Sequence, residues 1–365
     1  MRSRTGTGWG IALAALGVLS LAAAAILAWV VVPDRKQLPA DTDTSRQFSG
    51  TAKLLLNPQA LATGDLRSAV LINVPVTAQR TVKATATEGE AAEVSDTRVL
   101  STGTGAQVGR TEATYAVDRK SLEAASDPPS SWQVVPHEGL TVSWPIGAKK
   151  QDYTAWVNET KSTTTARFVR EENKGGVDTY VYEADVATAP VKDEQVLGAL
   201  PKGLPVSAVT ALASALPLPP DAKALLAQAL PALPDPVPLN YTYEAKSTFW
   251  VEPTTGLVVD TERAEIRKAG MVLRTGGALP GIPVYDVATN FTEQSVNEAA
   301  ADANDAKNSI DLYSTTLPLI LLGVGLVALV AGVALLLAGR RAAGTGGEGP
   351  GSASPAGPSP AGPSP

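Results

Sequence analysis

The side chains that are best suited by chemistry to bind a ligand gather in one short stretch of the sequence, between residues 144 and 156. Aromatic rings and lysines lie close together there, although few of the 365 residues are aromatic. Rings beside cations could line a groove for a sugar or for the anionic headgroup of a lipid. The same rings could instead fill the core of a sheet, and the sequence leaves both interpretations open. The residues are Trp144, Lys149, Lys150, Tyr153 and Trp156.

The sequence contains no recognisable catalytic or metal-binding motif. His137 is the only histidine and there is no cysteine, so zinc and copper would lack their preferred ligands and no disulfide can form. Carboxylate clusters such as Glu171 with Glu172 do not have the spacing of a calcium-binding loop. We therefore expect a protein that is not an enzyme and that holds neither a metal nor another cofactor.

A second candidate site lies in residues 191–239, which are rich in alanine, leucine and proline. Residues 207–216 and 221–230 predict two short helices, with Ser207 and Asp221 as N-caps and a proline after each helix. Each helix carries an apolar stripe, which could cover an acyl chain as a lid or could pack as ordinary core. The candidate ligand-binding leucines on these stripes are Leu212, Leu216, Leu225, Leu226 and Leu230.

Most of the elements that must position these residues are predicted to be strands. Residues 76–87 alternate between apolar and polar side chains, with Arg80 interrupting the apolar side, and this period of two predicts a strand with one wet face. Turn sequences at 173–176 and 253–256 predict two hairpins. A helix with Ser295 as its N-cap should follow the sheet. Further strands are predicted at 52–56, 93–100, 107–117, 140–144, 166–171, 177–186, 241–251 and 257–266.

Two long apolar segments without a charged residue lie at opposite ends of the chain. Residues 9–32 and 317–338 are each long enough to cross a bilayer as a helix. Arginines precede the first segment and follow the second, and the positive-inside tendency then places both termini in the cytoplasm. These arginines are Arg2, Arg4, Arg340 and Arg341.

This topology predicts a β-rich α+β fold in the cytoplasmic (inner) membrane, in which an antiparallel-sheet ectodomain with a short helical insert is flanked by two transmembrane helices. The composition of the C-terminal tail, rich in Gly, Pro and Ser, is typical of disorder. The regions are a cytoplasmic N-terminus at 1–8, transmembrane helix 1 at 9–32, the extracytoplasmic domain at 33–316 with its insert at 191–239, transmembrane helix 2 at 317–338, and a disordered cytoplasmic tail at 339–365.

The charge of the chain restricts its partners. Acidic residues outnumber basic ones and the formal net charge is −6. A nucleic-acid surface would need clustered lysines and arginines, so nucleic acid is not an expected partner. The lipid bilayer is the partner that the apolar segments require, and envelope lipids, glycolipids or envelope-assembly proteins are further candidates.

Three stretches of the sequence carry a family resemblance: Tyr115–Ser121, Gly139–Trp156 and Phe249–Asp260. In them the chain resembles an actinobacterial family of two-span envelope proteins of unknown function that is often labelled the porin PorA family. The resemblance covers both apolar segments and nearly all of the region between them, and it brings no catalytic residues. It implies a place in the actinobacterial cell envelope. A β-barrel pore, however, would need strands with a lipid-facing apolar band and would not carry apolar spanning helices.

These observations predict a membrane-tethered, non-enzymatic protein of the cell envelope that binds or transfers a lipid or glycolipid. Two alternatives stay open at this point. The protein could be a porin or a porin-associated component, as the family label implies, or a scaffold that docks partner proteins and binds no small ligand.

Overall fold

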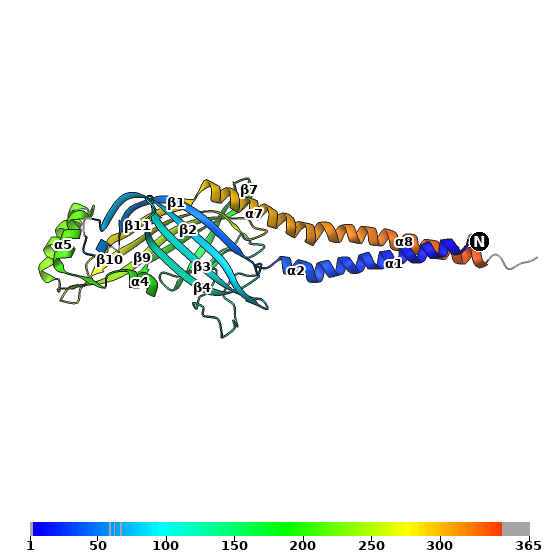
Figure 1. The fold of residues 1–365 in the computed structure, drawn as a ribbon, viewed down its shortest axis with the longest axis horizontal. Coiled ribbons are helices and arrows are strands. Elements are labelled where there is room, and N and C mark those ends of the chain that lie inside the picture. Colours follow the sequence, from blue (N-terminus) through cyan, green and yellow to red (C-terminus); the bar gives the residue numbers. More distant parts are fainter. Residues whose placement is uncertain (1–2, 58–59, 62, 66–67, 345–365) are drawn as a thin grey trace, which may run out of the picture. The chain divides into compact units, whose positions relative to one another are not determined.

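The computed structural model describes residues 3–344 except 58–59, 62 and 66–67, so the predicted disordered tail lies outside the described residues from 345 onward. The chain divides into two compact units, each described by itself below (Figure 1). The first comprises residues 1–34 together with 310–365, and the second comprises residues 35–309. The helices of the first unit are α1 (Ser3–Ile26), the π-helical turn η1 (Leu27–Val31), α2 (Val32–Arg35), the π-helical turn η3 (Leu312–Thr316) and α8 (Leu317–Gly344).

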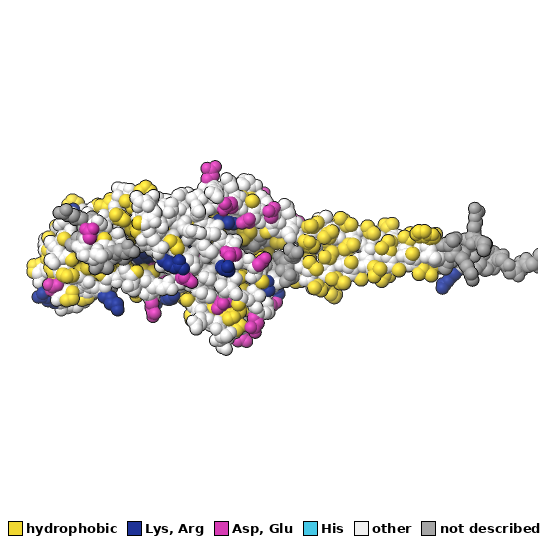
Figure 2. All heavy atoms as spheres, in the orientation of Figure 1, with side chains coloured by type: hydrophobic (Ala, Val, Ile, Leu, Met, Phe, Trp, Pro, Cys, Tyr) yellow, Lys and Arg dark blue, Asp and Glu magenta, His cyan; other side chains and the backbone are white. Residues whose placement is uncertain are grey.

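The first unit is a pair of apolar helices, α1 and α8, whose surface is largely hydrophobic (Figure 2). Residues 8–31 and the helical stretch 293–341 are long and apolar enough to cross a membrane. Glycines let the two backbones approach closely, because a Cβ atom on Gly17 would lie 2.7 Å from the backbone nitrogen of Leu329. A Cβ atom on Gly332 would lie 2.5 Å from the backbone nitrogen of Ala14, whereas one on Gly323 would meet nothing within 4 Å.

The second unit is built on one antiparallel sheet that curls into a half-barrel (Figure 1). The strand order is β4-β3-β2-β1-β11-β10-β9-β7-β6-β5, and β8 pairs with β9. The β-rich fold class predicted from the alternating patterns is therefore confirmed. The strands are β1 (Asp43–Leu56), β2 (Val70–Glu88), β3 (Ala91–Thr102), β4 (Gln107–Asp118), β5 (Tyr153–Val157), β6 (Ser162–Lys174), β7 (Val177–Pro190), β8 (Gly203–Leu204), β9 (Val237–Val251), β10 (Val258–Met271) and β11 (Ile282–Phe291).

Short helices accompany this sheet. The helical insert follows β7 and comprises α4 (Glu194–Ala199), α5 (Val206–Ala215), α6 (Pro220–Ala229) and the 3₁₀ turn η2 (Leu230–Ala232). Figure 1 shows α5 at one end of the sheet. The helix α7 (Glu293–Asp311) follows β11, and its Val296 and Ala299 pack against Phe48 and Phe291 of the sheet.

The core lies on one face of the half-barrel, which we call the inner face. Because side chains of opposed residues in a ladder share a face, the register places Ala78 beside Leu100 and Val82 beside Asp96 on this face. Most of the buried aromatic and aliphatic residues of the sheet lie here. One large cluster joins β3 and β4 to β5, β6, β7 and β9, and it includes Val94, Tyr115, Trp144, Tyr153, Tyr182 and Val251.

Two local predictions outside the helical insert were wrong. Residues 140–144 do not form a strand: Leu140 makes one isolated bridge to Ala155, and the N–H of Trp144 donates to the carbonyl of Gly256 at 3.2 Å instead of to a neighbouring strand. Ser295 is not the N-cap of α7. The hydroxyl of Thr292 accepts the backbone N–H of Ser295 at 3.2 Å, which is the bond of a capping residue, while Ser295 Oγ accepts the N–H of Gln47 at 2.8 Å.

Candidate functional site: an apolar pocket beneath the helical insert

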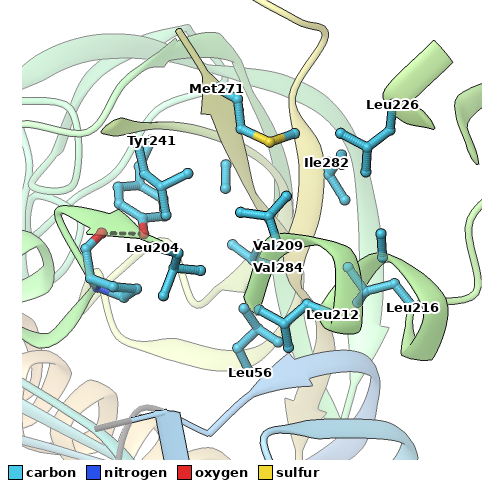
Figure 3. Close-up of a pocket in the computed structure, with 14 residues that line it drawn as sticks. Leu56, Leu204, Val209, Leu212, Leu216, Leu226, Tyr241, Met271, Ile282 and Val284 are labelled. Carbon is cyan, nitrogen blue, oxygen red and sulfur yellow. Dashed lines mark hydrogen bonds between the residues drawn. The ribbon is translucent and has the colours of Figure 1, made fainter. Parts of the chain in front are cut away.

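An apolar pocket lies between the helical insert and the end of the sheet (Figure 3). The helices α5 and α6 form one wall, and the strands β9, β10 and β11 form the opposite wall, with Leu56 of β1 and Leu204 of β8 beside them. The lining residues that the figure labels are Leu56, Leu204, Val209, Leu212, Leu216, Leu226, Tyr241, Met271, Ile282 and Val284.

The sequence explains why the insert covers this end of the sheet. The apolar residues of α5 recur at helical spacing, so that Val209 and Leu212 lie on one buried face of the helix. On α6, Leu226 is buried as well. These helices are too short to be stable alone in water, so burial of their apolar faces must hold them against the sheet.

The two helices begin differently from the sequence prediction. Ser207 and Asp221 are not N-caps, because α5 begins at Val206 after Pro205 and α6 begins at Pro220 after Pro219. Proline suits the first turn of a helix, since its fixed φ matches the helix and its missing N–H would have no partner there. At the start of α5, Asp235 Oδ1 accepts the N–H of Val206 at 3.2 Å and replaces the expected cap.

The chemistry of the pocket is that of a hydrocarbon site. The pocket opens to solvent at its mouth, and its cavity volume, counted as the space for the centre of a water-sized sphere, is about 60 Å³. Tyr241 contributes a hydroxyl, but this group donates to the carbonyl oxygen of Pro201 at 2.7 Å and is therefore already satisfied (Figure 3). Water gains no hydrogen bonds from such walls, whereas each CH₂ group buried against them contributes about 0.8 kcal/mol. The described residues that line the pocket can hold an apolar chain and offer no group for acid–base or nucleophilic chemistry.

Three of the five predicted leucines line this pocket: Leu212, Leu216 and Leu226. Leu230 packs in the neighbouring hydrophobic cluster but does not line the pocket. Leu225 points away from the core, because 44% of its surface is exposed. The structure therefore brings together the part of the predicted stripe that faces the sheet.

The predicted aromatic and lysine stretch lies elsewhere in the unit and shares no residue with the pocket. Trp144 and Tyr153 are buried in the large core cluster, and Trp156 packs against it. The hydroxyl of Tyr153 accepts the backbone N–H of Lys149 at 2.8 Å. Lys150 forms an exposed ion pair with Glu171 at 2.5 Å. The rings thus occupy the position expected of sheet core, and ligand binding by this stretch stays a prediction.

The structure also shows a group of charged residues on the inner face that sequence reasoning did not identify as a site. We call it the interior charge cluster; it consists of Arg80, Asp96, Arg98, Glu159, Arg263, Glu265 and Arg267. Glu265 Oε1 lies 2.9 Å from Arg263 Nε and accepts the hydroxyl of Tyr243 at 2.7 Å. Arg267 pairs with Glu159 and lies over the ring of Tyr285, 4.2 Å from its centroid.

Electrostatics keeps the acids of this cluster ionised. Burial alone would raise the pKa of Glu265, but the positive charges of Arg263, Arg98 and Arg267 outweigh it and lower that pKa to about 2. Burial likewise acts to raise the pKa of Asp96, and the charge and hydrogen bonds of Arg80 lower it below the usual value. Burial raises the pKa of Tyr243, so that its hydroxyl stays protonated and can donate to Glu265.

Among the described residues, no group of three or more histidines, cysteines and carboxylates is placed to hold a metal ion. His137 packs against the ring of Tyr115, with 5.0 Å between centroids, and burial lowers the pKa of its imidazole. Its Nδ1 lies 3.3 Å from the carbonyl oxygen of Val135. The apolar pocket and the interior charge cluster are two features of the described residues that a ligand could use.

Comparison with known proteins places the sequence in context. The family model described as Porin PorA matches residues 9–334, which is most of the chain. None of the curated proteins matches the sequence. Similarity to solved structures is low, with TM-scores near 0.14.

Three of these solved structures are described here. Full-length peroxisomal multifunctional enzyme type 2 from Drosophila melanogaster is 14% identical, with 69% of this chain and 37% of that chain covered and a TM-score of 0.14. A putative MaoC domain protein dehydratase from Chloroflexus aurantiacus is 12% identical over 76% of this chain and 80% of that one, with a TM-score of 0.14. A conserved hypothetical protein from Mycobacterium tuberculosis with a double hotdog fold is 10% identical over 74% and 80%, also with a TM-score of 0.14. Scores this low carry neither fold nor activity to this chain.

Proposed function

The chain belongs to the Porin PorA family, and from that premise we propose that it is a membrane-anchored, non-enzymatic binding protein of the cell envelope. Its ligand is a lipid or glycolipid whose hydrocarbon part enters the apolar pocket. The observation that carries this proposal is the pocket itself, a concave site whose walls consist almost entirely of aliphatic side chains.

The proposed placement in the cytoplasmic membrane rests on the two apolar helices. Arg340 and Arg341 end the apolar stretch of α8, and their charge favours a cytoplasmic position for the C-terminus. With two spans the N-terminus lies on the same side, and residues 35–309 lie outside the cytoplasm. Reporter fusions to the two termini test this topology, and an extracytoplasmic signal from either terminus would contradict it.

Photo-crosslinking tests the binding function directly. The full chain is reconstituted with a lipid that carries a photoreactive group near the end of its acyl chain, and the labelled residues are mapped by mass spectrometry. We expect labels on pocket residues such as Leu212, Leu226 and Met271. The two apolar helices should also be labelled from the bilayer, and this labelling is an internal control for the amount of lipid.

Two tryptophan variants sharpen the test. Ala213→Trp places a large ring in the pocket, whereas Ala211→Trp places the same ring on the exposed side of α5. Pocket labelling should fall several-fold in the first variant and stay unchanged in the second, while labelling of α1 and α8 is constant in both. Absence of pocket labels in the unmodified protein, or equal labelling in the two variants, would rule out the pocket as the lipid site.

A second candidate function, a porin or porin component, is favoured by the description of the family. Against a pore formed by one chain stands the character of α1 and α8, which are apolar on all sides and pack directly against each other. Planar-bilayer recordings of the purified full chain distinguish the two functions. We expect no stepwise conductance in several salts, and reproducible single-channel steps would favour the porin.

A further inference from the structure

Three arginines stand side by side on the inner face of the sheet. Arg46 of β1 lies opposite Arg80 of β2, and Arg80 lies opposite Arg98 of β3. Like charges in opposed positions of a ladder repel each other, so each arginine needs a compensating partner. Arg46 pairs with Asp302 of α7. Arg80 donates two hydrogen bonds to Asp96, at 2.9 and 2.8 Å.

Arg98 has no comparable partner among the residues that the structure describes. Its ion pair with Glu265 is long, at 3.9 Å, and the Glu265 oxygen involved is already shared by Arg263 and the hydroxyl of Tyr243. Burial and the positive charge of Arg263 lower the pKa of Arg98, which is the behaviour of a cation whose charge is not fully compensated. The side chain nevertheless keeps 31% of its surface accessible, so a small solute can reach it.

The carboxylates around Arg98 and Arg263 are engaged elsewhere. Glu159 pairs with Arg267. Asp96, whose charge also acts on Arg98, accepts two hydrogen bonds from Arg80. Arg263 itself is incompletely satisfied, because its buried Nε makes no hydrogen bond although it lies 2.9 Å from Glu265. Positive charge therefore stays in excess at this point of the inner face.

We propose that Arg98 and Arg263 form a binding site for a phosphate group, supplied either as free phosphate or as the headgroup of an amphiphile. The planar guanidinium group presents paired N–H donors that match the oxygens of phosphate, and the bond strengthens in a partly desolvated site. A bound phosphate would supply the negative charge that the arginines lack. None of the residues that line the apolar pocket belongs to the interior charge cluster, so this site does not depend on lipid binding in the pocket.

Thermal unfolding of the full chain in a neutral maltoside detergent tests the site. The additives are inorganic phosphate, a short-chain alkyl phosphate and the uncharged alcohol of the same chain, with ionic strength held constant by chloride. The variants are Arg98→Gln and, as a matched control, Arg110→Gln, which removes an exposed arginine from the neighbouring strand β4. We expect phosphate to raise the melting temperature of the unmodified chain and of the control variant.

In Arg98→Gln the apparent affinity for phosphate should fall at least tenfold. The melting temperature without phosphate should change little, because the variant removes the repulsion from Arg80 and Arg263 together with the attraction to Glu265. If this variant does not fold, Arg98→Lys replaces it. That variant keeps the charge but loses the paired donors, so it should respond to phosphate more weakly than the unmodified chain.

The additives separate the two sources of phosphate. A response to inorganic phosphate identifies a free anion as ligand, and a response to the alkyl phosphate alone identifies an amphiphile. The uncharged alcohol should have no effect that depends on Arg98. The proposal is overturned if neither phosphate compound stabilises the chain, or if Arg98→Gln keeps the full response. Ala213→Trp should retain the response to inorganic phosphate, which separates this result from any result on the pocket.

Discussion

Acidification should destabilise the unit of residues 35–309, and Glu265 should account for a large part of the loss. Burial acts to raise the pKa of this carboxyl group, but Arg263, Arg98 and Arg267 outweigh burial and lower it to about 2. In the unfolded chain these arginines are distant and the pKa returns to its ordinary value of 4.5. The unfolded state therefore binds a proton more readily, so low pH favours unfolding.

The size of the effect follows from the two pKa values. A difference between 4.5 and about 2 corresponds to roughly 3 kcal/mol of stability, because one pKa unit is worth about 1.36 kcal/mol. This contribution of Glu265 is fully present above the unfolded pKa of 4.5 and is lost as the pH falls towards the folded pKa of about 2. About 2 kcal/mol should already be lost at pH 3, a substantial fraction of the roughly 5–15 kcal/mol that stabilises a typical domain.

Urea unfolding of the full chain at several pH values between about 6 and 3 measures this loss, with the fluorescence of the buried Trp144 and Trp250 as the signal. Glu265→Gln cannot titrate. It should be less stable than the unmodified chain by about 3–5 kcal/mol near neutral pH, because it leaves buried arginines without their acid. Between pH 5 and pH 3 the stability of Glu265→Gln should then fall by about 2 kcal/mol less than the stability of the unmodified chain. The exposed Glu112→Gln is the control and should follow the unmodified chain. Parallel curves for Glu265→Gln and the unmodified chain would refute the assignment of the acid effect to Glu265.

Two further predictions concern packing. Leu226→Ala should destabilise the domain by about 2–3 kcal/mol, the lower end for a buried leucine, because empty space already adjoins the side chain. Leu225→Ala should change stability by less than about 1 kcal/mol, since the side chain of Leu225 is largely exposed. Urea unfolding of both variants measures the two losses, and equal losses would contradict the burial of Leu226. Gly332→Leu should weaken the pairing of α1 with α8 at least tenfold, because the leucine side chain would collide with the α1 backbone. Gly323→Leu is the control and should leave the pairing unchanged, because a side chain there enters open space. Energy transfer between labelled peptides of the two helices in detergent measures the pairing, and equal transfer in the two variants would show that the glycine contact is unimportant.

Much of the sheet could be predicted from sequence because one face of each strand is buried. The alternation at 76–87 lies within β2, and the turns at 173–176 and 253–256 join β6 to β7 and β9 to β10 as predicted. The strand β11 (Ile282–Phe291) was not predicted. Its buried residues Val284 and Val287 are three positions apart, because a bulge shifts the register opposite Arg267 and Lys268 and breaks the period of two.

The candidate sites differ in how far sequence could reveal them. The three predicted leucines of the pocket were predictable because α5 and α6 are each a continuous amphipathic segment. The strand wall opposite was not, because Tyr241, Met271 and Ile282 come together only through the order of β9, β10 and β11. The interior charge cluster left one sign in the sequence: Arg80 interrupts the apolar side of its strand. Its partner Asp96 could be identified only once the register of β2 and β3 was known.

Stability alone does not explain why the inner face carries so many charges. Removing several ions from water costs energy that their mutual attraction often fails to recover, and a buried ion pair can frequently be replaced by apolar residues without loss. If the charges served stability alone, we would expect balanced pairs such as Arg80 with Asp96. Arg98 instead lies 3.9 Å from Glu265, a carboxylate that is already paired with another residue. The position of Arg98 opposite Arg80 makes the arrangement still less favourable, because two like charges face each other in the ladder. An anion bound by N–H groups of Arg98 and Arg263 that Glu265 does not occupy removes this difficulty, because the uncompensated positive charge then binds the anion.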